Sequence, residues 1–135
     1  MSGSKESAGL ATGWIEAWIR MDMAWLREHL APDFVHVSPF GRLEGRDHYL
    51  ATVEPMARKS VSELTIREVI ADGDRAAIWF ENRTPGGTVP TCDWLRIDGG
   101  RIREIRSFYD STAVRGVLSR EDQANLAGKY GLEED

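Results

Sequence analysis

Cysteine is almost absent from this chain of 135 residues, with Cys92 as its one example. A single thiol cannot form an intrachain disulfide or supply a zinc cluster built on several thiolates. Disulfide-dependent folds belong mostly to oxidising compartments, whereas free thiols persist in reducing ones. We therefore expect a cytoplasmic protein whose stability comes from packing, with Cys92 as a small buried apolar residue.

Long apolar runs and basic clusters are also missing from the sequence. No stretch approaches the roughly 20 apolar residues that a membrane-spanning helix needs, and the N-terminus lacks the apolar region of a signal peptide. The formal net charge is −5, and the lysines and arginines form no stripe. These absences argue against a membrane and against nucleic acid as partners.

What is present fits one globular domain, with 41% hydrophobic and 29% charged residues. The polar segment 1–8 is expected to be disordered, and residues 9–112 are expected to form the domain. The tail, 113–135, contains few apolar residues. Its pattern predicts a helix over 119–129 with Ser119 as the N-cap.

Helical periodicity dominates the first part of the chain. From Gly9, apolar residues recur every three or four positions, which places them on one stripe. Asp22 is a candidate N-cap for a second helix over 23–30, which Pro32 is expected to end. A third helix is predicted over 46–59, and Pro55 is expected to kink or end it. The stripe of the first helix comprises Leu10, Trp14, Trp18, Met21 and Trp25.

Alternation with a period of two marks the strands. A short strand over 33–39 places Phe34, His36 and Ser38 on one face, and a brief return strand follows over 42–45. Beyond residue 61, strands alternate with glycine-containing turns, which predicts an antiparallel meander. Its four strands cover residues 62–71, 75–84, 89–98 and 101–110.

Three segments carry a family resemblance: LAPDFVHVSPFGRLEG, DWLRIDGGRI and IREIRSFYD. With the order of elements, they resemble the NTF2-like superfamily and within it the ketosteroid-isomerase and SnoaL-like branches, over residues 8–112. The resemblance implies an α+β fold, the NTF2-like or cystatin-like α+β barrel. In this fold a cone-like curved antiparallel sheet wraps over N-terminal helices and encloses a pocket.

The resemblance also implies roles for individual residues. Asp93 matches the acid that ketosteroid isomerases keep protonated, and Asp110 matches the final-strand acid of SnoaL-like cyclases and limonene-epoxide-hydrolase-like enzymes. The isomerases have a carboxylate where Ser38 stands, and the epoxide hydrolases have an arginine where Thr91 stands. Arg106 is a candidate substitute for that arginine, because it alternates with Asp110 onto one face of the last strand.

His36 is a candidate that the sequence itself suggests. It shares a strand face with Ser38, and an unperturbed pKa near 6.5 suits a general base. A core histidine held by a hydrogen bond is an equally good interpretation. One inward histidine with Asp93 and Asp110 falls short of a usual metal site, so we expect no metal and no cofactor.

Two functions remain open on these observations. The first is an enzyme that applies general acid–base catalysis to a small hydrophobic molecule, as an isomerase, cyclase or epoxide hydrolase. Asp93 would be the proton donor or oxyanion partner, and His36 or Asp110 would be the base. The candidate substrate-binding residues are mainly aromatic: Trp14, Trp18, Phe34, Ser38, Tyr49, Trp79 and Phe108.

The second function is a non-catalytic module of the same fold, for ligand binding or for dimerisation. It is favoured by Ser38 and Thr91, which replace the carboxylate and the arginine of the enzymes. With either function we expect a homodimer, because the final strands can pair with a second copy.

Overall fold

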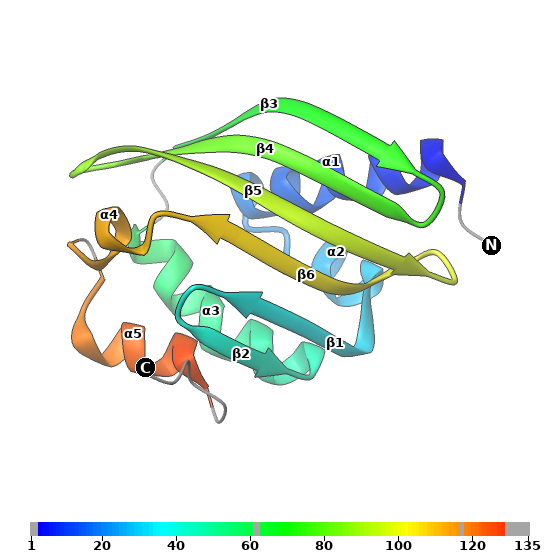
Figure 1. Cartoon of the computed structure of the whole chain (residues 1–135). Helices are drawn as coiled ribbons and strands as arrows, with labels where there is room; N and C mark the ends of the chain where they lie inside the picture. Colours follow the sequence, from blue (N-terminus) through cyan, green and yellow to red (C-terminus); the bar gives the residue numbers. More distant parts are fainter. Residues whose placement is uncertain (1–2, 61–62, 117, 129–135) are drawn as a thin grey trace, which may run out of the picture.

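A single curved sheet with helices behind it forms the protein (Figure 1). The computed structural model describes residues 3–60, 63–116 and 118–128. The helices are α1 (Ser4–Arg20), α2 (Met23–His29), α3 (Arg46–Ser60), α4 (Ser111–Arg115) and α5 (Arg120–Ala127). The strands are β1 (Leu30–Ser38), β2 (Gly41–Glu44), β3 (Glu63–Asp72), β4 (Arg75–Thr84), β5 (Gly87–Asp98) and β6 (Arg101–Tyr109).

The strands of the sheet lie in the order β2-β1-β6-β5-β4-β3. Strands β3 to β6 form the predicted antiparallel meander. The first hairpin, β1 and β2, joins the sheet through a parallel pairing of β1 with β6, which the sequence pattern did not predict. The expected α+β fold, with a curved sheet over helices, is confirmed.

The N-terminal helix begins earlier than expected. Helix α1 starts at Ser4, and Ser7 is buried, with its hydroxyl donating a 2.6 Å hydrogen bond to the carbonyl oxygen of Gly73. Contact with the turn between β3 and β4 therefore orders residues 3–8. The sequence pattern did not predict this contact, because Ser7 is simply one polar residue in a polar segment. The expected disorder of residues 1–2 lies outside the described residues.

Local signals explain the second and third helices. The carboxylate of Asp22 accepts a 3.0 Å hydrogen bond from the backbone nitrogen of Trp25, which confirms it as the N-cap of α2. The helix ends at His29, three residues before Pro32, which lies in β1. Pro55 does not end α3, which continues from Arg46 to Ser60.

The tail packs onto the sheet as two short helices. The hydroxyl of Ser119 accepts from the backbone nitrogen of Asp122, which confirms the predicted cap of α5. Leu126 of this helix is buried, and Gly41 of β2 faces the backbone of Ala127 with no room for a Cβ atom. The tail thus shares the core of the domain, and residue 112 is no boundary in the packing.

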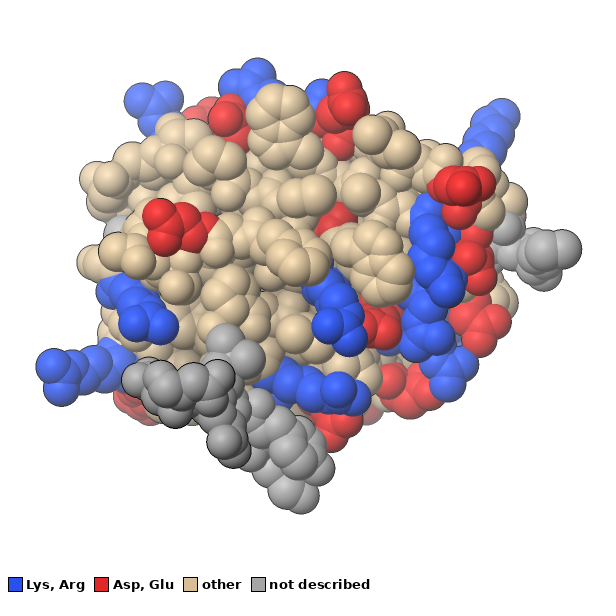
Figure 2. All heavy atoms as spheres, viewed as in Figure 1, with Lys and Arg blue, Asp and Glu red and all other residues tan. Residues whose placement is uncertain are grey.

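The two faces of the sheet differ sharply. The face toward the helices carries the core, and its strand residues include Ile78, Leu95 and Ile105. The outer face leaves Trp79 and Phe108 exposed by 46% and 58%. Figure 2 shows this outer face, where an uncharged area is flanked by charged side chains. No helix in the described part of the chain is long and apolar enough to cross a membrane.

Candidate functional site

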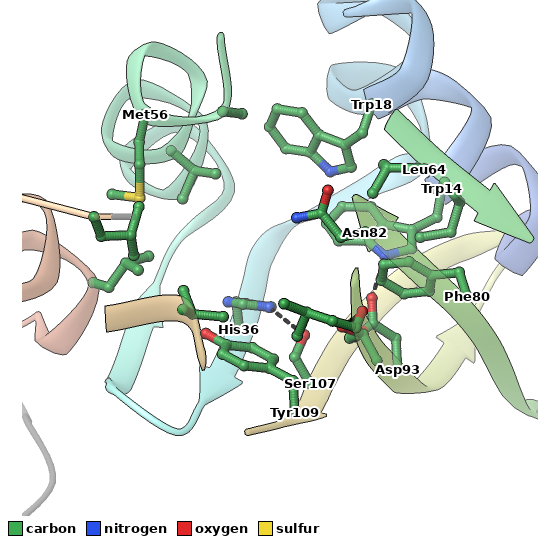
Figure 3. Close-up of a pocket in the computed structure, with 18 of the residues that line it drawn as sticks. Trp14, Trp18, His36, Met56, Leu64, Phe80, Asn82, Asp93, Ser107 and Tyr109 are labelled. Carbon is green, nitrogen blue, oxygen red and sulfur yellow. Dashed lines mark hydrogen bonds between the residues drawn. The ribbon is translucent and has the colours of Figure 1, made fainter. Parts of the chain in front are cut away.

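A cavity of about 190 Å³ lies between the inner face of the sheet and the helices. Its walls are mostly aliphatic and aromatic, and they come from α1, α3, β1, β3 to β6 and the tail. None of the described residues that line it is a lysine or an arginine. Its polar side chains are His36, Tyr49, Asn82, Thr91, Asp93, Ser107 and Tyr109 (Figure 3).

Asp93 is the one carboxylate among the described residues that line the cavity. It projects from β5 and is 3% exposed. The indole Nε1 of Trp14 donates a 2.8 Å hydrogen bond to its Oδ2 atom, and its buried Oδ1 atom has no hydrogen-bond partner among the described residues. Burial raises the pKa of Asp93 to about 6, and the nearby hydroxyl of Ser107 and the indole of Trp14 oppose that rise.

His36 reaches the same cavity from β1. Its Nε2 atom lies 2.9 Å from the hydroxyl oxygen of Ser107, and its ring packs against Tyr49 with centroids 5.0 Å apart. Burial lowers the pKa of His36 from 6.5 to about 4, because a charged imidazolium would lose its hydration there. The imidazole is therefore neutral near pH 7.

Ser107 connects the two titratable groups. It lies on β6 directly opposite Asp93 of β5, so its side chain shares the inner face with that carboxyl group. Its hydroxyl bonds with His36 and also lowers the pKa of Asp93. The hydroxyl therefore lies between a neutral imidazole, to which it is hydrogen-bonded, and the carboxyl group of Asp93.

Two tyrosines complete the polar part of the wall. Burial raises the pKa of Tyr109 to about 12, against the effect of a hydrogen bond with Ser38. The pKa of Tyr49 is also well above its usual value, because of burial and of the charge on Asp93. Both phenols therefore stay protonated at neutral pH and can donate hydrogen bonds.

The predicted residues that the structure brings together are few. Asp93 and His36 line the cavity, with Trp14, Trp18 and Tyr49 among the predicted wall residues. Phe34 and Ser38 are buried beside them, outside the lining: Phe34 packs on Tyr49 at 5.0 Å between centroids.

Four other predicted residues lie elsewhere, which corrects the expectation that they line the pocket. Asp110 caps α4 by accepting from the backbone nitrogen of Thr112 at 2.9 Å. Arg106 points to the outer face, where it pairs with Glu104. Trp79 and Phe108 are exposed on that same face. The reason is strand alternation: Arg106 and Phe108 do share a face, and that face is the outer one.

Cys92 also differs from its expected place. It is only half-buried, and it lies on the outer face between Trp79 of β4 and Phe108 of β6.

Sequence reasoning missed Asn82, Ser107 and Tyr109. Strand alternation contained part of the signal, because Ser107 and Tyr109 occupy the opposite face of β6 from Arg106. Pairing the strands across the Gly99-Gly100 turn places Asp93 opposite Ser107, so the inward face of one strand defines that of the other. No comparable signal marked Asn82 on β4.

A metal centre is not evident in the described ranges. Within them, no three His, Cys, Asp or Glu side chains gather as metal ligands would.

Comparisons with known proteins agree with this architecture. The family model of the SnoaL-like domain matches residues 11–105. Bal32a, from a soil-derived mobile gene cassette, superposes with a TM-score of 0.77 at 18% identity, covering 86% of this chain and 98% of its own. No curated protein sequence matches the chain.

Two further solved structures share the fold. A putative ketosteroid isomerase from Kribbella flavida gives a TM-score of 0.72 at 19% identity, with 82% of each chain covered. An LEH-like epoxide hydrolase from M. tuberculosis gives 0.71 at 21% identity, covering 85% of this chain and 91% of its own. Because the family model spans well over half of the chain, the protein belongs to the SnoaL-like domain family of the NTF2-like superfamily.

Proposed function

We propose that the protein is a cofactor-independent enzyme that moves a proton on a small hydrophobic molecule, with Asp93 as the acid–base group. The observation that carries this proposal is the Oδ1 atom of Asp93, which is buried in an apolar cavity and has no partner among the described residues. A partnerless carboxylate oxygen in such a place is costly for stability alone. It is useful when a substrate presents a proton to it.

The raised pKa of Asp93 suits this work. A carboxyl group with a pKa of about 6 is mostly ionised at pH 7, with roughly a tenth protonated. It is a stronger base than an exposed aspartate and still returns the proton readily, which is the condition for efficient general acid–base catalysis.

The other polar groups have supporting roles in the proposal. Neutral His36 is a weak base with a pKa of about 4, so it is better suited to orienting Ser107 than to taking the proton. Tyr109 stays protonated and lines the cavity, so it can donate to an oxygen atom that gains negative charge. This assigns the base to Asp93 rather than to His36 or Asp110.

The relatives support the same class of chemistry. Two structures with this fold belong to a putative ketosteroid isomerase and an LEH-like epoxide hydrolase. Isomerisation, cyclisation and epoxide opening all require a proton acceptor and control of a developing oxygen charge. The proposed reaction is of this type.

The test uses a probe that reports a desolvated carboxylate base. In 5-nitrobenzisoxazole, the base takes the carbon-bound proton, the C–H electrons form the nitrile and the ring N–O bond breaks, which opens the ring to a single coloured product, 2-cyano-4-nitrophenolate. We expect the protein to accelerate this elimination and Asp93→Asn to reduce the rate by about 10²- to 10⁴-fold. Asp110→Asn is the matched control, because it removes the same charge outside the cavity and asparagine also caps helices well.

The competing function is a non-catalytic ligand-binding module, which Ser38 favours because it stands where a second carboxylate would be. Equal rates for the wild type and Asp93→Asn, with probe binding retained in both, would support this module and overturn the enzyme proposal.

We also propose a homodimer formed through the outer face of the sheet. Trp79, Cys92 and Phe108 lie in one row across β4, β5 and β6, and both aromatic rings are exposed. An ion pair flanks the row on each side, and each pair offers one positive and one negative group. Arg67–Glu81 lies toward β3, and Arg106–Glu104 lies toward β1. A surface with this mixture is complementary to a twofold-related copy of itself.

The single thiol suits a reducing compartment such as the cytoplasm, because Cys92 is unpaired and only half-buried.

A further inference from the structure

Asn82 is a polar side chain in the cavity wall with no role in the acid–base chemistry. It projects from β4 into the same cavity as Asp93 (Figure 3). Its Oδ1 atom is buried and has no hydrogen-bond partner among the described residues. Buried polar atoms of side chains are nearly always paired, so an unpaired amide oxygen in a cavity wall indicates a ligand that supplies the partner.

The positions of Asn82 and Asp93 determine how far a ligand must reach to contact both residues. Asp93 lies opposite Ile78 of β4, and Asn82 is four residues further along the same strand. At about 3.4 Å per residue, the two backbone positions are separated by about 14 Å along the strand direction. Phe80 lies between them on the same inner face, and the hydroxyl of its neighbour Thr91 is directed to the carbonyl oxygen of Val89, so a largely apolar stretch separates two polar ends.

The cavity also limits the size and the charge of the ligand. Its volume of about 190 Å³ is below the range of about 300–1,000 Å³ that is usual for drug-sized ligands. A molecule of roughly one or two fused rings fits such a space. No described lining residue carries a positive charge that could compensate a ligand carboxylate, and Asp93 would repel one.

We infer that Asn82 determines specificity: the site takes a small, uncharged, flat apolar molecule with a polar group at each end, one meeting Asp93 and the other meeting the amide of Asn82. This inference rests on the proposed function for the role of the Asp93 end. An Asn amide can turn either its oxygen or its nitrogen toward the ligand, so a hydroxyl group satisfies it in both orientations.

The experiment compares naphthalene probes that differ only in their polar ends. The probes are 2-naphthol, 2,6-dihydroxynaphthalene and 6-hydroxy-2-naphthoate, with affinities measured by isothermal titration calorimetry at pH 7. We expect the wild type to bind the dihydroxy probe roughly fivefold more tightly than 2-naphthol, which corresponds to one additional hydrogen bond. We expect the naphthoate to bind more weakly than both.

The variants isolate the second polar end. Asn82→Leu removes the amide at nearly constant volume, so the fivefold preference should disappear while the affinity for 2-naphthol is kept. Asn82→Ala, which adds no bulk, should give the same loss of preference. The matched control is Arg83→Gln, an exposed neighbour on β4 that should retain the preference.

The outcomes are clear-cut and separate from those of the catalytic test. A preference retained in Asn82→Leu and Asn82→Ala, an absent preference in the wild type, or tightest binding of the naphthoate would each overturn the inference. All readings are equilibrium affinities, so they hold whether or not the protein turns over a substrate. An elimination rate that is the same in the wild type and in Asp93→Asn would overturn the proposed catalysis while leaving the Asn82 result intact.

Discussion

The indole nitrogen of Trp14 donates a 2.8 Å hydrogen bond to the carboxylate of Asp93, which ties the first helix to the fifth strand across 79 residues of sequence. The bond occupies one carboxylate oxygen, and the other is buried without a hydrogen-bond partner among the described residues. It also favours the ionised form, so it opposes the rise in the pKa of Asp93 that burial causes.

The first prediction concerns the pH dependence of the elimination rate. The wild-type rate should rise with pH through a midpoint at about 6, because the base must be ionised. Trp14→Phe removes a hydrogen bond that lowers the pKa of Asp93, so this rise should move to higher pH. Trp18→Phe is the control, because Trp18 lines the same cavity and its indole makes no bond to Asp93. A rise at the same pH in both variants would contradict the role of the Trp14 bond.

The second prediction concerns stability against pH, where Asp93 and His36 act in opposite directions. Between about pH 4 and 6 the folded state keeps Asp93 protonated and the unfolded state does not, so rising pH destabilises the fold. Between about pH 4 and 6.5 the unfolded state protonates His36 and the folded state does not, so rising pH stabilises the fold. Each effect amounts to about 3 kcal/mol.

Single substitutions should separate these two effects. In Asp93→Asn the free energy of unfolding should increase from pH 4 to 6.5, and in His36→Gln it should decrease from pH 4 to 6. Urea unfolding at half-unit pH steps measures both curves, and contributions from the remaining carboxylates cancel in their difference. If the free energy of unfolding changed with pH in the same way in both variants, the prediction that burial keeps both Asp93 and His36 uncharged between about pH 4 and 6 would be wrong.

The third prediction concerns the packing of α5 on β2. A Cβ atom at Gly41 would collide with the carbonyl oxygen of Ala127, and the φ angle of Gly41 is +155°. Gly41→Ala should therefore reduce the free energy of unfolding by about 1–3 kcal/mol. It should also weaken binding of 2-naphthol, because Leu126 of α5 lines the cavity.

The control for this prediction is Gly99→Ala, in the turn between β5 and β6. Its φ angle of +60° is strained for alanine, yet its Cβ direction is open. It should reduce stability without affecting probe binding, as urea unfolding and calorimetry on the same samples would show. Equal losses of affinity in both variants would mean that α5 does not shape the cavity.

The fourth prediction concerns the proposed dimer. Trp79→Ser combined with Phe108→Ser removes the exposed rings from the outer face, so sedimentation should show a monomer where the wild type is a dimer. Ile19→Ser is the control, since Ile19 is 50% exposed on α1, away from the sheet. A monomeric wild type would contradict the dimer, whatever the variants do.

Much of the fold follows from local signals in the sequence. The meander, the caps at Asp22 and Ser119 and the inward set of Phe34, His36 and Ser38 depend on neighbouring residues only. The start of α1 was misjudged because Ser7 is held by a turn 66 residues away.

The site was harder to predict because it depends on which face of β6 points inward. A shift of one residue exchanges the two faces of a strand, and the parallel pairing of β1 with β6 has no local signature. Arg106 and Asp110 were therefore expected in the cavity, where Ser107 and Tyr109 lie instead.

The close approach of Gly41 to Ala127 holds α5 against β2, so the tail forms a part of the cavity wall that can change independently of the rest. The stretch that matches the family model, residues 11–105, supplies Asp93 and Asn82. Val114, Leu118 and Leu126, which complete the wall, lie beyond it. A chimera that exchanges residues 111–128 with those of a relative would therefore alter this part of the cavity wall separately from its proton-transfer group.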